Sequence, residues 1–348
     1  MSRVSKLMLP FANWPAEDQG RWEEAFKTGD RFDDNGRGAH LAASTRQVQR
    51  ESYARFLGFI TANHQYLLTR PPDARIDRPI VAEYVAWRRR SCGEMSVAIA
   101  LDHLRGALRL ICPDTDWSWL LTITKRIAAT APRKARQYHL VTSDHLYALG
   151  IELMDGAVAD AAVAKRLSVA HAFQYRDGLV IALLALIPIR RRTLTALRIG
   201  KHLAKTGDLW ALDIPAADTK NRRPLDYPIS IELSARIDVY LERFRRRIPG
   251  ANTHTGLWAS NLGRPMCPDA IGAAVCRRTK KAFGFPVNLH RFRHAAASFW
   301  SSHDPVNVRD VKDLLGHASF GMTEKHYIMA QSRLAGRALA HAVDKLRK

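Results

Sequence analysis

The chain has 348 residues, a length that predicts two domains, or one domain with a sizeable appendage, and its 47% hydrophobic and 25% charged residues are typical of an ordinary soluble globular protein. Its 54 Lys and Arg residues outnumber 33 Asp and Glu residues, so the net charge is +21. This excess favours a polyanionic partner, nucleic acid ahead of an anionic membrane, because each neutralised phosphate releases condensed counterions.

The four cysteines are scattered and form no CxxC pair, which argues against a zinc ribbon or a disulfide framework and fits a reducing cytosol. The residues from Met1 to Val4 lack the apolar core of a signal peptide. The longest apolar run, Leu179 to Ile187, is too short to span a bilayer and stops at Pro188, so it predicts a buried helix. We therefore expect a cytoplasmic protein.

The N-terminal third is predicted to be helical. A short helix is expected over Pro15 to Phe26, followed by a turn-rich stretch from Asp33 to Gly38. Three further helices are indicated by apolar residues at helical spacing, the first capped by Ser44 or Thr45, the others over Pro79–Arg90 and Ser96–Ile111. Their expected inward-facing residues are Tyr53, Phe56, Leu57 and Ile60; Ile80, Val81, Tyr84 and Val85; and Val97, Ile99, Leu101, Leu104, Leu108 and Leu110. Trp117, Trp119 and Leu120 are expected to close this bundle.

A basic connector from Ala131 to Arg136 separates this unit from a larger one, and it fits a linker that crosses DNA as well as any solvated hinge. The second unit is predicted to open with helices over Ser143–Met154 and Ser168–Ile187. Two short strands, Leu209–Ile214 and Leu225–Ile229, are then joined by the polar turn Ala217–Arg223. Helices are predicted from Ser234 to Arg247 and onward.

The densest group of basic side chains is His290-Arg291-Phe292-Arg293-His294. On a helix, His290 and Arg293 point the same way, so a guanidinium fork could hold two phosphate oxygens while the imidazole donates to the same phosphate or shuttles a proton. The alternative is a solvated basic helix. A zinc site at His290 and His294 is disfavoured, because no Glu follows His290 as in HExxH and the two arginines would repel the cation.

Two further segments follow this basic group. Leu314-Leu315-Gly316-His317 ends an apolar helix at a glycine, which places His317 at a helix terminus, and Tyr327 is the only tyrosine after Tyr240. Taken alone, the Leu-Leu-Gly-His segment is a weak signal, because many core helices end in a glycine and a polar residue. Tyr327 taken alone is more often a packing residue than a nucleophile. A phenol with a pKa of roughly 10 is ionised in only about one molecule in a thousand at pH 7, so a nucleophilic tyrosine needs a concentrated positive field.

Together these segments resemble the tyrosine recombinase (phage integrase) family. The H-R-F-R-H box, the L-L-G-H box and Thr323-Glu324-Lys325-His326-Tyr327 match its motifs in order and spacing. The run Leu186 to Arg190, followed by Leu194 and Leu197, is similar to the box that carries the family's first arginine. Thr219-Lys220, with Pro228 eight residues beyond the lysine, is similar to its catalytic-lysine hairpin. The similarity covers most of the chain from about residue 40.

The chain departs from the family pattern at three points. Thr193 stands where the first box usually carries an acidic residue, three positions after its arginine. The run Arg190-Arg191-Arg192 leaves the register of that box open by one or two residues. Tyr327 lies ten residues after His317, where many members have nine.

The resemblance implies a fold that is mainly α with a small antiparallel β-sheet: a helical-bundle core-binding domain plus an α+β tyrosine-recombinase catalytic domain. We expect an N-terminal segment over 1–37, the core-binding, DNA-binding domain over 38–130, a linker over 131–140, and the catalytic domain with its C-terminal helix over 141–348.

The resemblance also implies a reaction that needs no metal, cofactor or ATP. The catalytic set that it implies is Arg190, Lys220, His290, Arg293, His317 and Tyr327. The two arginines would clamp the scissile phosphate, the histidines would add donors, and the tyrosine would attack to give a 3′-phosphotyrosyl bond. The lysine would protonate the leaving 5′-oxygen as general acid.

The partners that the resemblance implies are double-stranded DNA recombination sites, a homotetramer on synapsed DNA, and accessory proteins that bend DNA or set directionality, with no membrane. The helix predicted over Arg333–Lys348 would dock on a neighbouring subunit, or else pack on its own domain. Two alternative functions stay open. A monomeric type IB topoisomerase would use nearly the same residues to relax DNA, and a catalytically inactive DNA-binding regulator would keep the fold alone.

Overall fold

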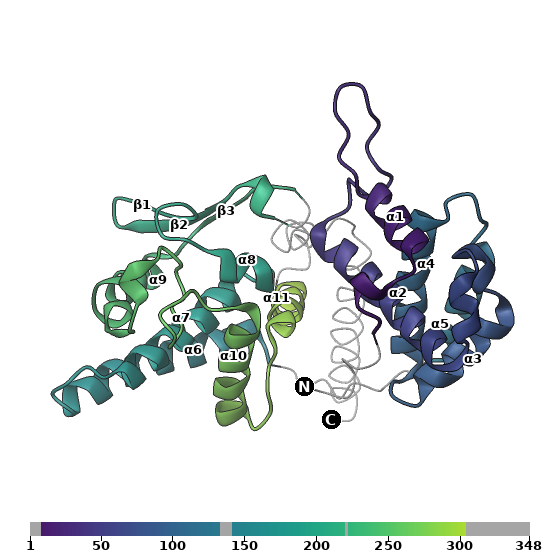
Figure 1. Cartoon of the computed structure of the whole chain (residues 1–348). Coiled ribbons are helices and arrows are strands. Elements are labelled where there is room, and N and C mark those ends of the chain that lie inside the picture. The colour runs from purple at the N-terminus through teal and green to yellow at the C-terminus, as the bar shows by residue number, and fades with distance from the viewer. Residues whose placement is uncertain (1–7, 133–140, 220–221, 304–348) are drawn as a thin grey trace, which may run out of the picture. The chain divides into compact units, whose positions relative to one another are not determined.

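The computed structural model describes residues 8–132, 141–219 and 222–303. The chain divides into two compact units, Met1–Gln137 and Tyr138–Lys348 (Figure 1). The predicted linker falls mostly outside the described residues, so its bounds and those of the four predicted segments stay predictions. As predicted, the described chain is mainly helical with one small antiparallel sheet.

The N-terminal unit is a bundle of helices (Figure 1), and its buried core is rich in aromatic side chains. Its α-helices are α1 (Ala16–Ala25), α2 (Ala43–Asn63), α3 (Arg78–Arg89), α4 (Glu94–Ile111) and α5 (Ser118–Thr130). The prediction missed α5, although it placed Trp117 and Leu120 in the core, where both are buried. Ile99 was wrongly placed in the core: it is 50% exposed, since it lies off the α4 stripe formed by Val97 and Leu101.

A buried polar triad joins helix α1 to the rest of this bundle. The carboxylate of Asp18 accepts hydrogen bonds from the hydroxyl of Tyr53 at 2.8 Å and from Nη1 of Arg75 at 2.5 Å. The side chains of Asp18 and Arg75 are almost wholly buried, so each charge depends on the other for its stabilisation. The triad thus makes α1 part of the bundle.

The starts of two helices differ in how they are capped. Helix α2 begins at Ala43 with Ala42 as its N-cap, so the expected cap by Ser44 or Thr45 is wrong, because both residues lie inside the first turn. Helix α3 begins after Asp77, whose carboxylate accepts from the backbone N–H of Ile80 at 2.8 Å.

The C-terminal unit combines helices with a three-stranded sheet. Its described α-helices are α6 (Ser143–Val163), α7 (Val169–Leu186), α8 (Arg191–Ala196), α9 (Ile231–Val239), α10 (Pro268–Phe283) and α11 (Leu289–His303). After α9 the chain stays helical through a π-helical turn, Tyr240–Phe244, and a 3-10 turn, Arg245–Arg247. This run begins three residues before the predicted start because Ser230 caps it.

Helix α7 is the central element of this unit. Ser168 and His171 form a capping box at its start, and most of its residues are buried in the core. Among the described residues it is the one helix long and apolar enough to span a membrane, but 67% of that stretch is buried inside the unit. Its burial agrees with the buried helix predicted there.

The sheet contains the two predicted strands and one that the prediction missed. Strands β1 (Leu203–Thr206), β2 (Leu209–Ile214) and β3 (Leu225–Pro228) pair antiparallel in the order β1-β2-β3. A two-residue turn joins the first pair, with Gly207 at a positive φ of 59°. Asp238 of α9 fixes that helix to the sheet, because it accepts from Nε1 of Trp210 at 2.9 Å and from Nζ of Lys205 at 2.8 Å.

Candidate functional site

Arg190 lies where helix α7 gives way to helix α8. Helix α7 ends at Leu186, and Pro188, which has no N–H to continue a helix, follows at the centre of a tight turn in which the N–H of Ile189 donates to the carbonyl of Ile187 at 2.7 Å. Arg190 is the N-cap residue of α8 and its carbonyl accepts from the N–H of Leu194 at 2.9 Å. Trp258 is buried and donates to the carbonyl of Leu194 at 2.9 Å. The short helix after Arg190 is thus fixed to the core, which holds the arginine half-buried.

Arg293, on helix α11, contacts the segment that joins α7 to α8. Its side chain is buried, and Nη1 donates to the carbonyl of Pro188 at 2.7 Å. Burial first and then the positive charge of Arg190 lower the pKa of Arg293, against a smaller opposing effect from Tyr227 on β3, and together they bring it to about 10. Residues 190 and 293, far apart in sequence, therefore lie close enough for their charges to repel.

The structure distinguishes the three consecutive arginines at the start of α8. Arg190 is the one whose charge acts on Arg293. Arg191 instead forms an exposed ion pair with Asp269 of α10 at 3.0 Å, and Arg192 is exposed. Thr193, which stands at the position where an acidic residue was expected, is buried. This geometry supports the register in which Arg190 is the site arginine.

His290 lies one helical turn before Arg293, as the spacing predicted. It is exposed at the start of α11, and its ring is perpendicular to that of His294 with 4.7 Å between the ring centres. Arg293 is thus the residue that lies near the charge of Arg190, and His290 precedes it by one turn near the start of α11. Side chains of these types can bind one tetrahedral anion through several donors at once.

The predicted lysine turn connects β2 to β3. Before it, a 3-10 turn, η5 (Ala216–Asp218), leads to Thr219, which is buried. After it, Arg222 has a positive φ of 51° and Arg223 leads into β3. Lys220 itself lies outside the described residues, and so do His317, Tyr327 and the predicted helix over Arg333–Lys348. Their assigned roles stay predictions.

Two contributors to the site were missed from sequence. The carbonyl of Pro188 holds the guanidinium of Arg293, and Tyr227 lies near enough to affect its charge. Tyr227 could have been found, because alternation along the predicted strand sets it on the same face as Leu225. A backbone acceptor such as that of Pro188 carries no side-chain signal.

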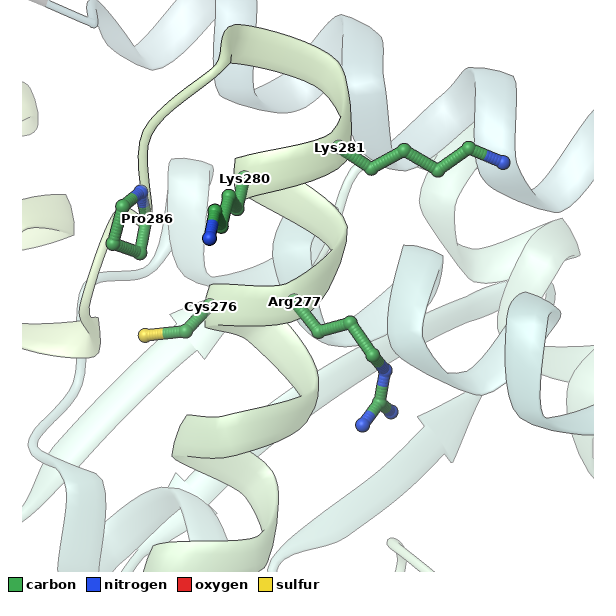
Figure 2. Close-up of a pocket in the computed structure, with 5 residues that line it drawn as sticks. All are labelled: Cys276, Arg277, Lys280, Lys281 and Pro286. Atoms are coloured by element: carbon green, nitrogen blue, oxygen red, sulfur yellow. The ribbon is translucent and has the colours of Figure 1, made fainter.

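A separate pocket of about 500 Å³ lies along helix α10. Figure 2 shows Cys276, Lys280 and Pro286 on one side of the helix, with Arg277 and Lys281 pointing to the other side. Burial raises the pKa of the Cys276 thiol, so it stays protonated at neutral pH and is a poor nucleophile. The basic residues that line this pocket therefore add positive charge along helix α10, and its cysteine does not add a reactive nucleophile.

Comparisons with known proteins identify the family of this chain. The model of the phage integrase family matches residues 160–333. The chain is 26% identical over 168 residues to tyrosine recombinase XerD of Chlamydia pneumoniae, a match that covers 48% of this chain and 53% of the relative. It is 26% identical over 175 residues to tyrosine recombinase XerC of Azotobacter vinelandii, covering 50% and 51%. The chain thus spans about half the length of the curated relatives it matches.

Among solved structures, the fold is similar to that of the XerH site-specific recombinase bound to its difH substrate in a pre-cleavage complex. The TM-score is 0.56 at 14% sequence identity, and the alignment covers 94% of this chain and 97% of that one. At this identity the likeness extends to the fold.

Proposed function

Because the chain belongs to the phage integrase family, the family of tyrosine recombinases, we propose that it is a site-specific DNA recombinase that cuts and rejoins DNA through Tyr327. The observation that carries the proposal is the closeness of Arg190 and Arg293, whose repulsion lowers the pKa of Arg293. Two like charges held near each other in a partly buried site repel, and an anion that binds to both lowers that repulsion. A scissile phosphate is such an anion.

In the proposed reaction the phenol oxygen of Tyr327 forms a bond to the phosphorus while the bond to the 5′-oxygen breaks. A site histidine takes up the phenol proton, and Lys220 gives a proton to the leaving 5′-oxygen. Arg190 and Arg293 neutralise the charge that grows on the non-bridging oxygens, where His290 adds a donor. The products are a 3′-phosphotyrosyl bond and a free 5′-hydroxyl, without metal or ATP.

The same geometry explains why the arginines suit this task. The bond from Nη1 of Arg293 to the carbonyl of Pro188 occupies one edge of the guanidinium and fixes its orientation. A fixed donor needs no rearrangement when charge develops in the transition state, and removal of one such donor typically costs 10²–10³ in rate, about 3 kcal/mol.

The proposed partners follow from the chemistry and the charge. The phosphotyrosyl link conserves bond energy, so a 5′-hydroxyl from a second duplex can reverse the step and exchange strands. We therefore propose that the protein joins two double-stranded sites as a homotetramer, aided by accessory proteins that bend DNA or set directionality. It would act in the cytoplasm, on the chromosome or on a mobile element.

The test is capture of the covalent adduct. On a nicked suicide substrate, wild-type protein should accumulate a protein–DNA adduct, whereas Tyr327→Phe should bind the DNA and form none. Tyr66→Phe, at an exposed tyrosine of the N-terminal unit, is the matched control and should form the adduct normally. Persistent adduct in Tyr327→Phe would move the nucleophile elsewhere, and no adduct in wild type would favour an inactive DNA-binding regulator.

A further inference from the structure

A buried histidine links the first strand of the sheet to the turn before position 220. His202, directly before β1, is 2% exposed. Its Nδ1 accepts from the backbone N–H of Arg198 at 3.2 Å, so this nitrogen carries a lone pair and the ring proton lies on Nε2. That Nε2 is 2.9 Å from the carboxylate of Asp218, the last residue of η5. His202 therefore donates to Asp218 as a neutral imidazole of fixed tautomer.

Asp218 is kept ionised by its neighbours. Nζ of Lys201 donates to the same carboxylate oxygen at 2.7 Å, and the hydrogen bonds from Lys201 and then His202 lower the pKa of Asp218. Lys201 is half-exposed, whereas the ring of His202 is buried. The exposed Lys201 adds a positive charge beside the carboxylate of Asp218. The buried ring of His202 fixes the orientation of that carboxylate, because a backbone N–H holds the ring from its other side.

The hydroxyl of Thr219 hydrogen-bonds with backbone groups on both sides of the β2–β3 turn. This hydroxyl accepts from the backbone N–H of Arg223 at 3.1 Å and lies within hydrogen-bond distance of the carbonyls of Arg223, at 2.8 Å, and Ala216, at 3.0 Å. A hydroxyl has one proton, so it donates to one of these carbonyls at a time. Thr219 thus joins the chain before the turn to the chain after it. Asp218, the residue before it, is held by His202.

We propose that His202, Asp218 and Thr219 are positioning residues that set where the β2–β3 turn delivers Lys220. The inference rests on the function proposed above. A lysine side chain has four rotatable bonds, and proton transfer requires its nitrogen within about 3 Å of the leaving oxygen, so the backbone must be fixed for the transfer to be efficient. A misplacement of about 1 Å can cost on the order of 10² in rate.

A purely structural role would make a different prediction. A variant that loosens the fold or distorts the phosphate clamp should slow cleavage whatever atom leaves. A variant that misplaces the general acid should slow cleavage only when the leaving atom needs a proton. A 5′-bridging sulfur separates the two, because a thiol with a pKa near 8.5 leaves as the anion without protonation, whereas an alkoxide does not.

The experiment measures single-turnover cleavage of two suicide substrates that differ only in a 5′-bridging oxygen or sulfur. His202→Leu should cleave the oxygen substrate on the order of 10- to 100-fold more slowly than wild type and the sulfur substrate at close to the wild-type rate. His202→Gln, which keeps a side-chain N–H donor, should recover part of the loss. Lys205→Ala, on strand β1 of the same sheet, removes an exposed ion pair with Asp238 of α9; it is the control and should match wild type on both substrates.

The outcomes separate this inference from the proposed function. Lys220→Ala should show the same recovery on sulfur, and failure of that recovery would overturn the general-acid assignment itself. If Lys220→Ala recovers and His202→Leu is equally slow on both substrates, or unaffected on both, the positioning role is wrong. Asp218→Ala, at a partly exposed carboxylate, gives a second variant with the same expected pattern if His202→Leu fails to fold.

Discussion

Replacing Arg293 by methionine is expected to leave the DNA-free protein at least as stable as wild type while removing its ability to cleave DNA. Burial and the charge of Arg190 lower the pKa of Arg293 to about 10, which corresponds to a penalty of about 3 kcal/mol for the charged form at about 1.4 kcal/mol per pKa unit. The penalty applies wherever Arg293 is charged, below pH of about 10, and so is fully present at pH 7.

Replacing Arg293 removes the unfavourable buried charge, but it also removes a hydrogen bond, and the two effects oppose each other. The hydrogen bond from Arg293 to the carbonyl of Pro188 involves a charged donor and is worth about 1.5–3 kcal/mol. The net change should therefore lie between zero and about 1.5 kcal/mol of stabilisation, because methionine fills the same space without charge. For a unit of this size, about 2–4 °C per kcal/mol applies, so the melting temperature should stay level or rise by a few degrees.

The assay is thermal unfolding of the DNA-free protein, followed by cleavage of a suicide substrate. Arg75→Met is the matched control, since Arg75 is an equally buried arginine whose charge is balanced by Asp18, and breaking that pair should cost about 3–5 kcal/mol. Added sulfate should stabilise wild type more than Arg293→Met, because an anion relieves the repulsion from Arg190. A drop of more than about 4 °C in Arg293→Met would refute the reasoning, which rests on the charge being costly without DNA.

Three further outcomes are expected. Arg191→Ala should change stability by less than about 1 kcal/mol and cleavage only slightly, because its ion pair with Asp269 is exposed; a loss in the cleavage assay as large as that of Arg190→Ala would shift the register of the box. DNA affinity, measured by fluorescence anisotropy, should fall about 10³-fold or more between 50 and 200 mM salt if six or more phosphates are contacted, and a flat response would contradict a DNA clamp. Deletion of residues 333–348 should reduce synapsis on native gels before it reduces binding to a single site; normal tetramers from the truncated protein would show that this segment packs on its own domain.

Much of the fold could be predicted because it follows local patterns. The apolar stripe through Val97 and Leu101 and the apolar run from Leu179 to Ile187 are local patterns, and the helices that they predict, α4 and α7, are present. Strand β1 was missed because it has only four residues, two of which, Ala204 and Lys205, are of types depleted in strands, although the Gly207-Asp208 pair before β2 is a hairpin signal. Helix α5 was missed because Trp117 and Trp119 were interpreted only as core residues.

The candidate site was less accessible to such reasoning. The i, i+3 spacing of His290 and Arg293 predicted a shared face, but no local pattern states that Arg293 lies beneath Pro188, over a hundred residues earlier. Likewise, the hydrogen bond of His202 to Asp218 depends on the pairing of β1 with β2, and β1 was not predicted. Contacts of this kind depend on the tertiary arrangement, and local patterns in a single sequence carry no information about it.

The Asp18–Tyr53–Arg75 triad has a practical consequence for anyone who shortens this protein. A fragment that starts after Phe26 would remove the only carboxylate that the described structure pairs with Arg75, and would leave a guanidinium and a phenol in an apolar interior. Such a fragment should aggregate or unfold even though every later helix is intact. Affinity tags and fusion partners are therefore best joined ahead of Trp14, and a fragment limited to the N-terminal unit must keep helix α1.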